Sequence, residues 1–150
     1  MNILLTGGCG YVGSYLTQEL LKDNHNVTVF DTQWFGNPLQ SHINLTNIKG
    51  DVRDIDAIPI EGKDVVIHLA AQALVRESYR SPEDTIETNV MGTINILESL
   101  RKLNHSCVVV IITSDKCYKN IEKREGYVET DELGGIDPYS ASKGSAEIAT

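Results

Sequence analysis

The sequence lacks the features that mark nucleic-acid-binding, membrane-spanning and secreted proteins. Its 13 Lys and Arg residues are outnumbered by 21 Asp and Glu residues, and the resulting net charge of −8 disfavours nucleic acid as a partner. No apolar run is long enough to cross a bilayer, and the chain enters a strand-like run directly after its first two residues, without a secretory signal. We therefore expect neither nucleic acid nor a membrane as a partner.

Cysteine is scarce as well. Cys9, Cys107 and Cys117 are odd in number and far apart, which favours free thiols in a reducing cytoplasm over a disulfide framework. Neither the cysteines nor the four histidines show the spacing of a zinc site, so no bound metal is expected. The remaining composition is that of an ordinary globular protein. With 150 residues, of which 41% are hydrophobic and 23% charged, the chain can form one domain with a core.

Short apolar runs alternate with amphipathic segments along the chain. Helices are expected over residues 11–22, 81–100 and 139–150. Strands are expected between them, and the last two strands are continuous apolar runs of the kind that a sheet buries on both faces. The expected strands cover residues 2–6, 27–30, 47–50, 64–71 and 107–112. This order predicts the α/β class, with a Rossmann-type, doubly wound parallel sheet.

The central helix and the loops carry more specific expectations. Ser81 can cap the helix whose first residue is Pro82. Residues 34–45 and 119–135 are expected to be loops, with the acidic residues between 122 and 132 forming a solvated surface. One apolar face is expected along the central helix, at Ile86, Val90, Ile94, Leu97 and Leu100.

A glycine-rich turn follows the first strand and opens the first helix. Gly8-x-Gly10-x-x-Gly13 has the spacing of the dinucleotide fingerprint, and Gly7 adds a second register. Such glycines let the backbone approach a pyrophosphate, for which the helix N-terminus supplies amides and a partial positive charge. A strand–helix turn that binds nothing is the alternative interpretation.

Asp31 favours the dinucleotide. It ends the second strand about 20 residues after the glycines, where a carboxylate can bind the ribose hydroxyls of NAD. No Lys or Arg follows it before Lys49, so nothing nearby would attract the 2′-phosphate of NADP. We therefore expect NAD rather than NADP.

The polar residues near the end of the chain suggest redox chemistry on a sugar. Tyr139 and Lys143 are four residues apart and share one face of the last helix, where the ammonium favours the ionised phenol. Ser114, Asp115 and Lys116 follow the apolar run that ends at residue 112. Taken singly, a Tyr-x-x-x-Lys pair can arise by chance, and a polar triplet can be a plain turn.

Five motifs occur in order along nearly the whole chain. They are Thr6-Gly7-x-x-Gly10-x-x-Gly13, Asp51-Val52-Arg53-Asp54, His68-Leu69-Ala70-Ala71-Gln72, Asn89-Val90-x-Gly92-Thr93 and Tyr139-x-x-x-Lys143. Together they resemble the extended short-chain dehydrogenase/reductase superfamily, which includes the NAD-dependent epimerases and dehydratases. From about residue 63 onward, segments 71–76, 113–118 and 134–140 are similar to the CDP-glucose 4,6-dehydratases. Before residue 60 the chain departs from those enzymes, which have His-Thr where Gly8-Cys9 stand, and this leaves the nucleotide sugar open.

The resemblance implies a nucleotide-sugar 4,6-dehydratase, a lyase that oxidises C4, eliminates water across C5 and C6 and returns the hydride to C6. It implies that Tyr139, assisted by Lys143, takes the proton of the 4-hydroxyl while Ser114 bonds the same oxygen. Asp115 is then the acid of the elimination, and Lys116 occupies the position of its base. His68 is expected near the cofactor rather than as a catalyst, and Cys117 as a packing thiol.

The resemblance also implies a set of residues that contact NAD. The set comprises Gly7, Gly10, Tyr11, Val12, Gly13, Asp31, Asp51, Val52, Leu69, Ala70, Ala71, Asn89, Tyr139 and Lys143.

Two alternatives to the dehydratase remain. A 4-epimerase would use Tyr139 and Lys143 without the Asp115–Lys116 pair. A catalytically silent NAD-binding module is the other, because the C-terminal part holds most of the nucleotide sugar in this superfamily. The last helix reads on to Thr150 without a stop signal, so we expect residues 1–150 to be the NAD-binding part of a longer enzyme, truncated before that region. A homodimer in the cytoplasm is the expected state.

Overall fold

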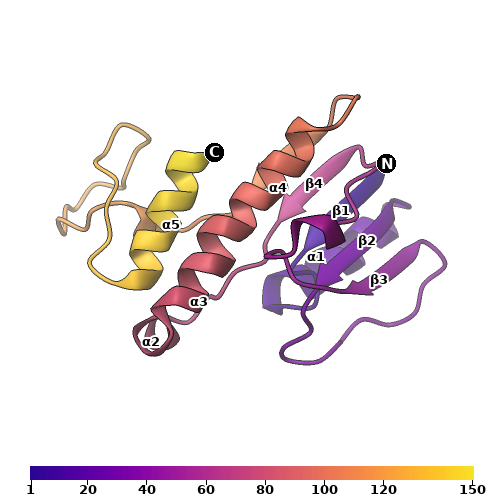
Figure 1. Ribbon diagram of the computed structural model, residues 1–150, viewed down its shortest axis with the longest axis horizontal. Helices are drawn as coiled ribbons and strands as arrows, with labels where there is room; N and C mark the ends of the chain where they lie inside the picture. Colours follow the sequence, from indigo (N-terminus) through magenta and orange to yellow (C-terminus); the bar gives the residue numbers. More distant parts are fainter. The chain divides into compact units, whose positions relative to one another are not determined.

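The computed structural model describes residues 1–150, which form two compact units (Figure 1). Residues 1–70 and 95–112 make up the sheet unit, and residues 71–94 and 113–150 make up the helical unit. All the strands belong to the sheet unit, whereas the last helix, α5 (Pro138–Ala149), belongs to the helical unit. None of the helices combines the length and the apolar character that crossing a bilayer requires.

The sheet unit contains one five-stranded sheet in which every pairing is parallel, as the sequence predicts. The strand order is β3-β2-β1-β4-β5, so the chain first moves outward from β1 in one direction and then in the other. This reversal next to β1 is the position at which doubly wound sheets bind ligands, beyond the carboxyl ends of the strands. The strands are β1 (Asn2–Thr6), β2 (Asn26–Asp31), β3 (Leu45–Lys49), β4 (Val65–His68) and β5 (Val108–Ile111).

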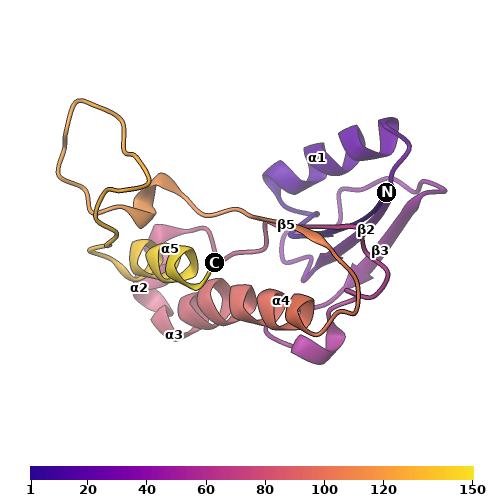
Figure 2. The same ribbon diagram turned by 90° about the horizontal axis from the view of Figure 1, so that it is seen from above.

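Apolar side chains cover both faces of this sheet. On one face, Leu5 and Val29 belong to a cluster that Leu16 and Leu20 of α1 (Tyr11–Lys22) complete. On the other face, Leu4, Phe30 and Val66 pack with Ile96 of α4 (Gly92–Arg101). Figure 2 shows α1 and α4 on opposite sides of the strands. The prediction of a doubly wound Rossmann-type sheet is therefore confirmed.

The last strand is less buried than the sequence suggests. β5 pairs in parallel with β4, as expected, but Val108 is 62% exposed and Val110 is 42% exposed. The expectation of a strand buried on both faces is wrong: β5 is the edge of this sheet, and of its residues only Ile111 packs against one of the apolar clusters. In β4, Val66 and His68 are buried, whereas the residues that alternate with them are half-buried.

The helical unit begins with a helix that the sequence analysis did not anticipate, α2 (Val75–Arg80). The predicted helix after Ser81 is present as α3 (Pro82–Ile86), a π-helical turn η2 (Glu87–Met91) and α4, which follow without a break. The capping prediction for Ser81 is wrong, because its side chain makes no capping hydrogen bond. Instead its carbonyl oxygen accepts from the backbone N–H and the hydroxyl of Thr85.

The predicted apolar face of this helix is wrong in its first half. Ile86 is 39% exposed, whereas Thr85, Asn89 and Thr93 are buried. The hydroxyl of Thr93 donates to the carbonyl of Asn89, four residues earlier, and Thr85 bonds Ser81 in the same way. A hydroxyl satisfied within its own helix can be buried like a small apolar group, so hydropathy alone selects the wrong stripe.

The charged segment 119–135 is a loop, as predicted, and its acidic residues are exposed except for Asp131, but two of them also form ion pairs. Lys119 pairs with Glu132, Lys123 pairs with Asp131, and the ring of Tyr127 stacks on that of Tyr118. The hydrogen bond to Lys123 lowers the pKa of the Asp131 carboxyl. These contacts close the loop on itself before α5 (Pro138–Ala149) begins.

Candidate active site

The turn between β1 and α1 is shaped by positions at which no side chain fits. Gly7 has a φ of +74°, and a Cβ there would lie 2.6 Å from the backbone nitrogen of Ala70. A Cβ on Gly13 would lie only 2.2 Å from the carbonyl oxygen of Gly7. The backbone N–H of Gly10 donates to that same oxygen over 3.1 Å. The turn therefore closes tightly on the start of the helix, as the fingerprint predicts.

No side chain caps the N-terminus of α1. Gly10 precedes the helix and carries no side chain that could cap it, and the first turn contains no acidic residue. The first amides of a helix have no partners within it. The side chains of Tyr11 and Val12 are exposed at 97% and 59%. These backbone donors and the positive end of the helix suit a pyrophosphate.

Asp31, at the carboxyl end of β2, braces this turn. Its Oδ2 accepts from the backbone N–H of Cys9 over 2.9 Å, and its Oδ1 accepts from that of Gln33 over 2.6 Å. Each carboxylate oxygen can accept a further hydrogen bond, so both remain able to receive ribose hydroxyls. Burial and the nearby Asp31 charge raise the pKa of the Cys9 thiol, which favours a packing role for it.

The end of β4 lies directly against the glycine turn. The backbone N–H of Leu69 donates to the Thr6 carbonyl, and that of Ala70 donates to the Thr6 hydroxyl. The same hydroxyl lies 2.7 Å from Nδ1 of His68, which is buried. Of the residues predicted to contact NAD, Leu69 and Ala70 are thus brought together with Gly7, whereas Ala71 belongs to the helical unit.

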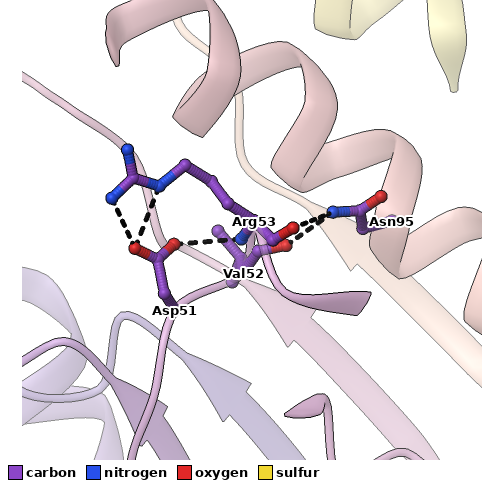
Figure 3. A network of polar contacts seen from close by, with 4 residues as sticks. All are labelled: Asp51, Val52, Arg53 and Asn95. Atoms are coloured by element: carbon purple, nitrogen blue, oxygen red, sulfur yellow. Dashed lines mark hydrogen bonds and ion pairs between the residues drawn. The ribbon is translucent and has the colours of Figure 1, made fainter. Parts of the chain in front are cut away.

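A second acidic turn follows β3, as Figure 3 shows. The backbone N–H, Nε and Nη2 of Arg53 all donate to the carboxylate of Asp51. These hydrogen bonds from Arg53 lower the pKa of Asp51. Asn95 of α4, which the sequence analysis missed, donates to the carbonyls of Val52 and Arg53 over 2.9 and 3.0 Å.

In the helical unit, α5 carries Tyr139 and Lys143 on one buried face. They are 9% and 7% exposed, which agrees with the predicted spacing on a shared helical face. Asp137 caps this helix by accepting from the Ser140 N–H and hydroxyl. Burial lowers the pKa of the Lys143 ammonium. The pair therefore combines a phenol with a cation held away from water.

Asn89 connects this helix to the π-helical turn. Its Nδ2 donates to the hydroxyl of Ser142 over 2.8 Å and to the carbonyl of Gln72 over 3.1 Å, and its Oδ1 accepts from the Gln72 N–H. The hydroxyl of Ser142 in turn donates to the carbonyl of Tyr139. Both amide hydrogens of Asn89 are therefore used within the unit. Asn89 thereby joins the helix that carries Tyr139 to the segment at Gln72; the sequence patterns did not predict these contacts of Gln72 and Ser142.

The Ser114–Asp115–Lys116 triplet opens a short 3-10 turn, η3 (Asp115–Cys117), which packs on α5. The Ser114 hydroxyl donates to the carboxylate of Asp115 over 3.0 Å and accepts from the Lys116 N–H. The side chains of Asp115 and Lys116 are exposed, whereas Cys117 is buried and its pKa is raised by burial. Cys117 is a packing thiol, as expected.

Comparison with known proteins identifies a family whose members share this sequence pattern. The model of the "NAD dependent epimerase/dehydratase family" matches residues 3–150. CDP-glucose 4,6-dehydratase of Salmonella typhimurium is 38% identical, over 97% of this chain and 43% of its own length. A putative UDP-glucose 4-epimerase of Methanocaldococcus jannaschii is 34% identical, over 94% and 47%.

Solved structures also resemble the chain. A dTDP-glucose 4,6-dehydratase variant from Streptomyces venezuelae, crystallised with NAD, matches with a TM-score of 0.88 and 28% identity over 99% of this chain and 50% of that one. UDP-glucose 4-epimerase of Thermus thermophilus in complex with NAD matches with a TM-score of 0.85 and 30% identity, over 99% and 49%. The chain thus spans about half the length of the relatives that it matches.

The Asn89 network predicts a measurable loss of stability. Ser142→Ala leaves one buried hydrogen of Asn89 without an acceptor, and it should lower the free energy of unfolding by about 1–3 kcal/mol in urea titrations. Ser145→Ala is the matched control, because the Ser145 hydroxyl is exposed and bonds only the Ala141 carbonyl. Its effect should stay within about 0.5 kcal/mol. Equal effects of the two substitutions would contradict the assigned network.

Lys143 predicts a pH-dependent term in stability. Burial lowers the pKa of its ammonium below the ordinary 10.5, so the unfolded chain holds this proton more tightly than the folded chain does. The penalty is complete below the lowered pKa and disappears as the pH rises from there toward 10.5. Urea titrations should therefore show wild type gaining stability relative to Lys143→Met across this window. A difference that is constant or declines with pH would disprove the assignment.

Proposed function

The chain belongs to the NAD-dependent epimerase/dehydratase family, and from this premise we propose that it binds NAD and takes part in the 4,6-dehydration of a nucleotide sugar. The observation that carries the first half of the proposal is the fit of the glycine turn to a dinucleotide. Gly7 and Gly13 leave no room for a Cβ, the first amides of α1 are uncapped, and Asp31 stands beside the turn with acceptor capacity to spare. The same groups suit a pyrophosphate and its neighbouring ribose.

The proposed substrate is CDP-glucose. The 38% identity to CDP-glucose 4,6-dehydratase supports this choice over other nucleotide sugars. The acid–base pair Asp115–Lys116 supports dehydration, since epimerisation at C4 has no need of it. A 4-epimerase is the second candidate, because UDP-glucose 4-epimerases match with 34% and 31% identity.

Each catalytic residue has a role that its chemistry allows. Tyr139 takes the proton of the sugar 4-hydroxyl, Lys143 stabilises the phenolate, and Ser114 donates to the same oxygen. NAD, when bound, supplies the acceptor and later the donor of hydride. Once C4 is a ketone, the hydrogen on C5 is acidic, so that Lys116 can remove it while Asp115 protonates the departing 6-hydroxyl.

A lysine, Lys116, is an unusual choice for the base of the elimination. A lysine acts as a base only when it is neutral, and it acquires that state more readily where other positive charges or burial disfavour the ammonium. The Lys116 side chain is exposed in the free chain. The proposed role therefore requires that substrate and cofactor cover this residue when they bind.

We also propose a homodimer in the cytoplasm as the working state. The partly exposed apolar residues Ile86, Val90 and Ile94 of the helical unit provide a surface that a second copy can cover. All three cysteines are free, which suits a reducing compartment.

Product analysis tests the proposed reaction. The protein is incubated with NAD and CDP-glucose, and the nucleotide-sugar product is weighed by mass spectrometry. Loss of one water supports dehydration, whereas an unchanged mass with inverted C4 supports the epimerase. NAD binding without any turnover supports the silent binding module.

Asp115→Asn separates the acid from the rest of the site. Without a proton for the 6-hydroxyl, the elimination should slow by about 100-fold or more, and the 4-keto sugar should accumulate. Asp23→Asn, an exposed position at the end of α1, is the matched control and should leave the rate unchanged. Full dehydration by Asp115→Asn would show that the acid is another residue.

A further inference from the structure

The side chain of Asn95 holds the Asp51–Arg53 turn, residues 51–53 after β3, from outside the turn. Asn95 lies on α4, and its Nδ2 donates to the carbonyls of Val52 and Arg53 over 2.9 and 3.0 Å (Figure 3). A primary amide has two hydrogens on this nitrogen, so one group fixes two successive peptide carbonyls. Because Asn95 extends from a helix that packs on the sheet through Ile96, its own position is set by the core.

Inside the turn, the charges compensate each other. The Asp51 carboxylate accepts from the Arg53 N–H over 2.9 Å, from Nε over 2.9 Å and from Nη2 over 2.6 Å. The side chains of Asp51 and Arg53 remain 30% and 39% exposed, whereas Val52 is buried. The turn therefore presents a paired carboxylate and guanidinium at the surface, above an apolar anchor.

The location of the turn connects it to the nucleotide site. The N–H of Gly50 donates to the carbonyl of Asp31, and a Cβ on Gly50 would lie 2.2 Å from the ring of Phe30. The turn is thus pressed against the carboxyl end of β2, beside the carboxylate proposed to bind ribose. A dinucleotide whose pyrophosphate lies at α1 and whose ribose lies at Asp31 directs its adenosine half toward this turn.

We infer that Asn95 is a positioning residue for the adenosine half of NAD and acts by holding the Asp51–Arg53 turn in its binding shape. The inference rests on the proposed function, because it assumes that NAD occupies the carboxyl edge of the sheet. With Asn95 in place, the Val52 and Arg53 carbonyls are directed toward α4, and the paired side chains of Asp51 and Arg53 stay partly exposed. Without its donors, two carbonyls lose their partners and the turn can adopt other conformations.

The test is isothermal titration of this protein with NAD, ADP-ribose and nicotinamide mononucleotide. Asn95→Asp keeps the size of the side chain but removes both donors. Asn95→Asp should weaken the affinity for NAD and for ADP-ribose by about tenfold each. The affinity for nicotinamide mononucleotide should stay within about twofold of the wild-type value. Asn104→Asp makes the same change of charge at an exposed residue soon after α4 and should leave all three affinities unchanged.

The fragment comparison separates positioning from plain stabilisation. A general loss of folded protein would reduce all three affinities together, whereas a displaced turn reduces only those of the ligands that contain adenosine. If Asn95→Asp does not fold, Asn95→Ser is the second variant, since it keeps one hydroxyl donor. It should show the same selective loss of affinity for the ligands that contain adenosine, but a smaller one.

The outcomes are distinct. Wild type that binds NAD, with a selective loss in the Asn95 variant, supports the inference. Wild type that binds NAD, with an Asn95 variant that binds ADP-ribose equally well or loses all three ligands alike, overturns the inference and leaves the proposed function standing. Wild type that binds no NAD overturns the proposed function and the inference with it.

Discussion

The exclusion of a side chain at Gly13 is the constraint on which the nucleotide site depends. With hydrogen in place of a Cβ, the first turn of α1 approaches the Gly7 carbonyl and the end of β1 closely enough to leave its amides at the carboxyl edge of the sheet. Gly7 extends the same close approach to the end of β4 through the backbone of Ala70. The hydrogen bond from Cys9 to Asp31 then ties the turn to β2. One loop is thereby fixed by three adjacent strands.

The helical unit holds a phenol and a lysine side chain away from water. Tyr139 and Lys143 are buried on one face of α5, at a cost that Lys143 shows in its lowered pKa. Polar contacts help to orient this helix, since Asn89 joins its Ser142 to Gln72. Such a network specifies one arrangement because every buried donor in it has an acceptor.

Sequence patterns predicted the parts of the molecule in which local chemistry and fold agree. Parallel apolar strands, the glycine spacing, Asp31 at a strand end and the Tyr139–Lys143 face all follow from periodicity and chain order. The patterns failed where a hydrogen bond within a helix, the position of a strand in the sheet or a contact between distant segments decides. Thr85 and Thr93 are buried because their hydroxyls bond within the helix, β5 is exposed because it is an edge, and Asn95 acts through contacts more than 40 residues away in sequence. Hydropathy and residue spacing alone predict none of these three features.

The most direct test of this account is the affinity of NAD for Gly13→Ala, measured by isothermal titration beside wild type. The added methyl forces the helix away from the Gly7 carbonyl, so the affinity should fall by at least about tenfold while far-UV circular dichroism still shows a folded chain. Gly126→Ala, where a methyl meets open space, should bind as wild type does. A folded Gly13→Ala protein with the affinity of wild type would contradict the central claim.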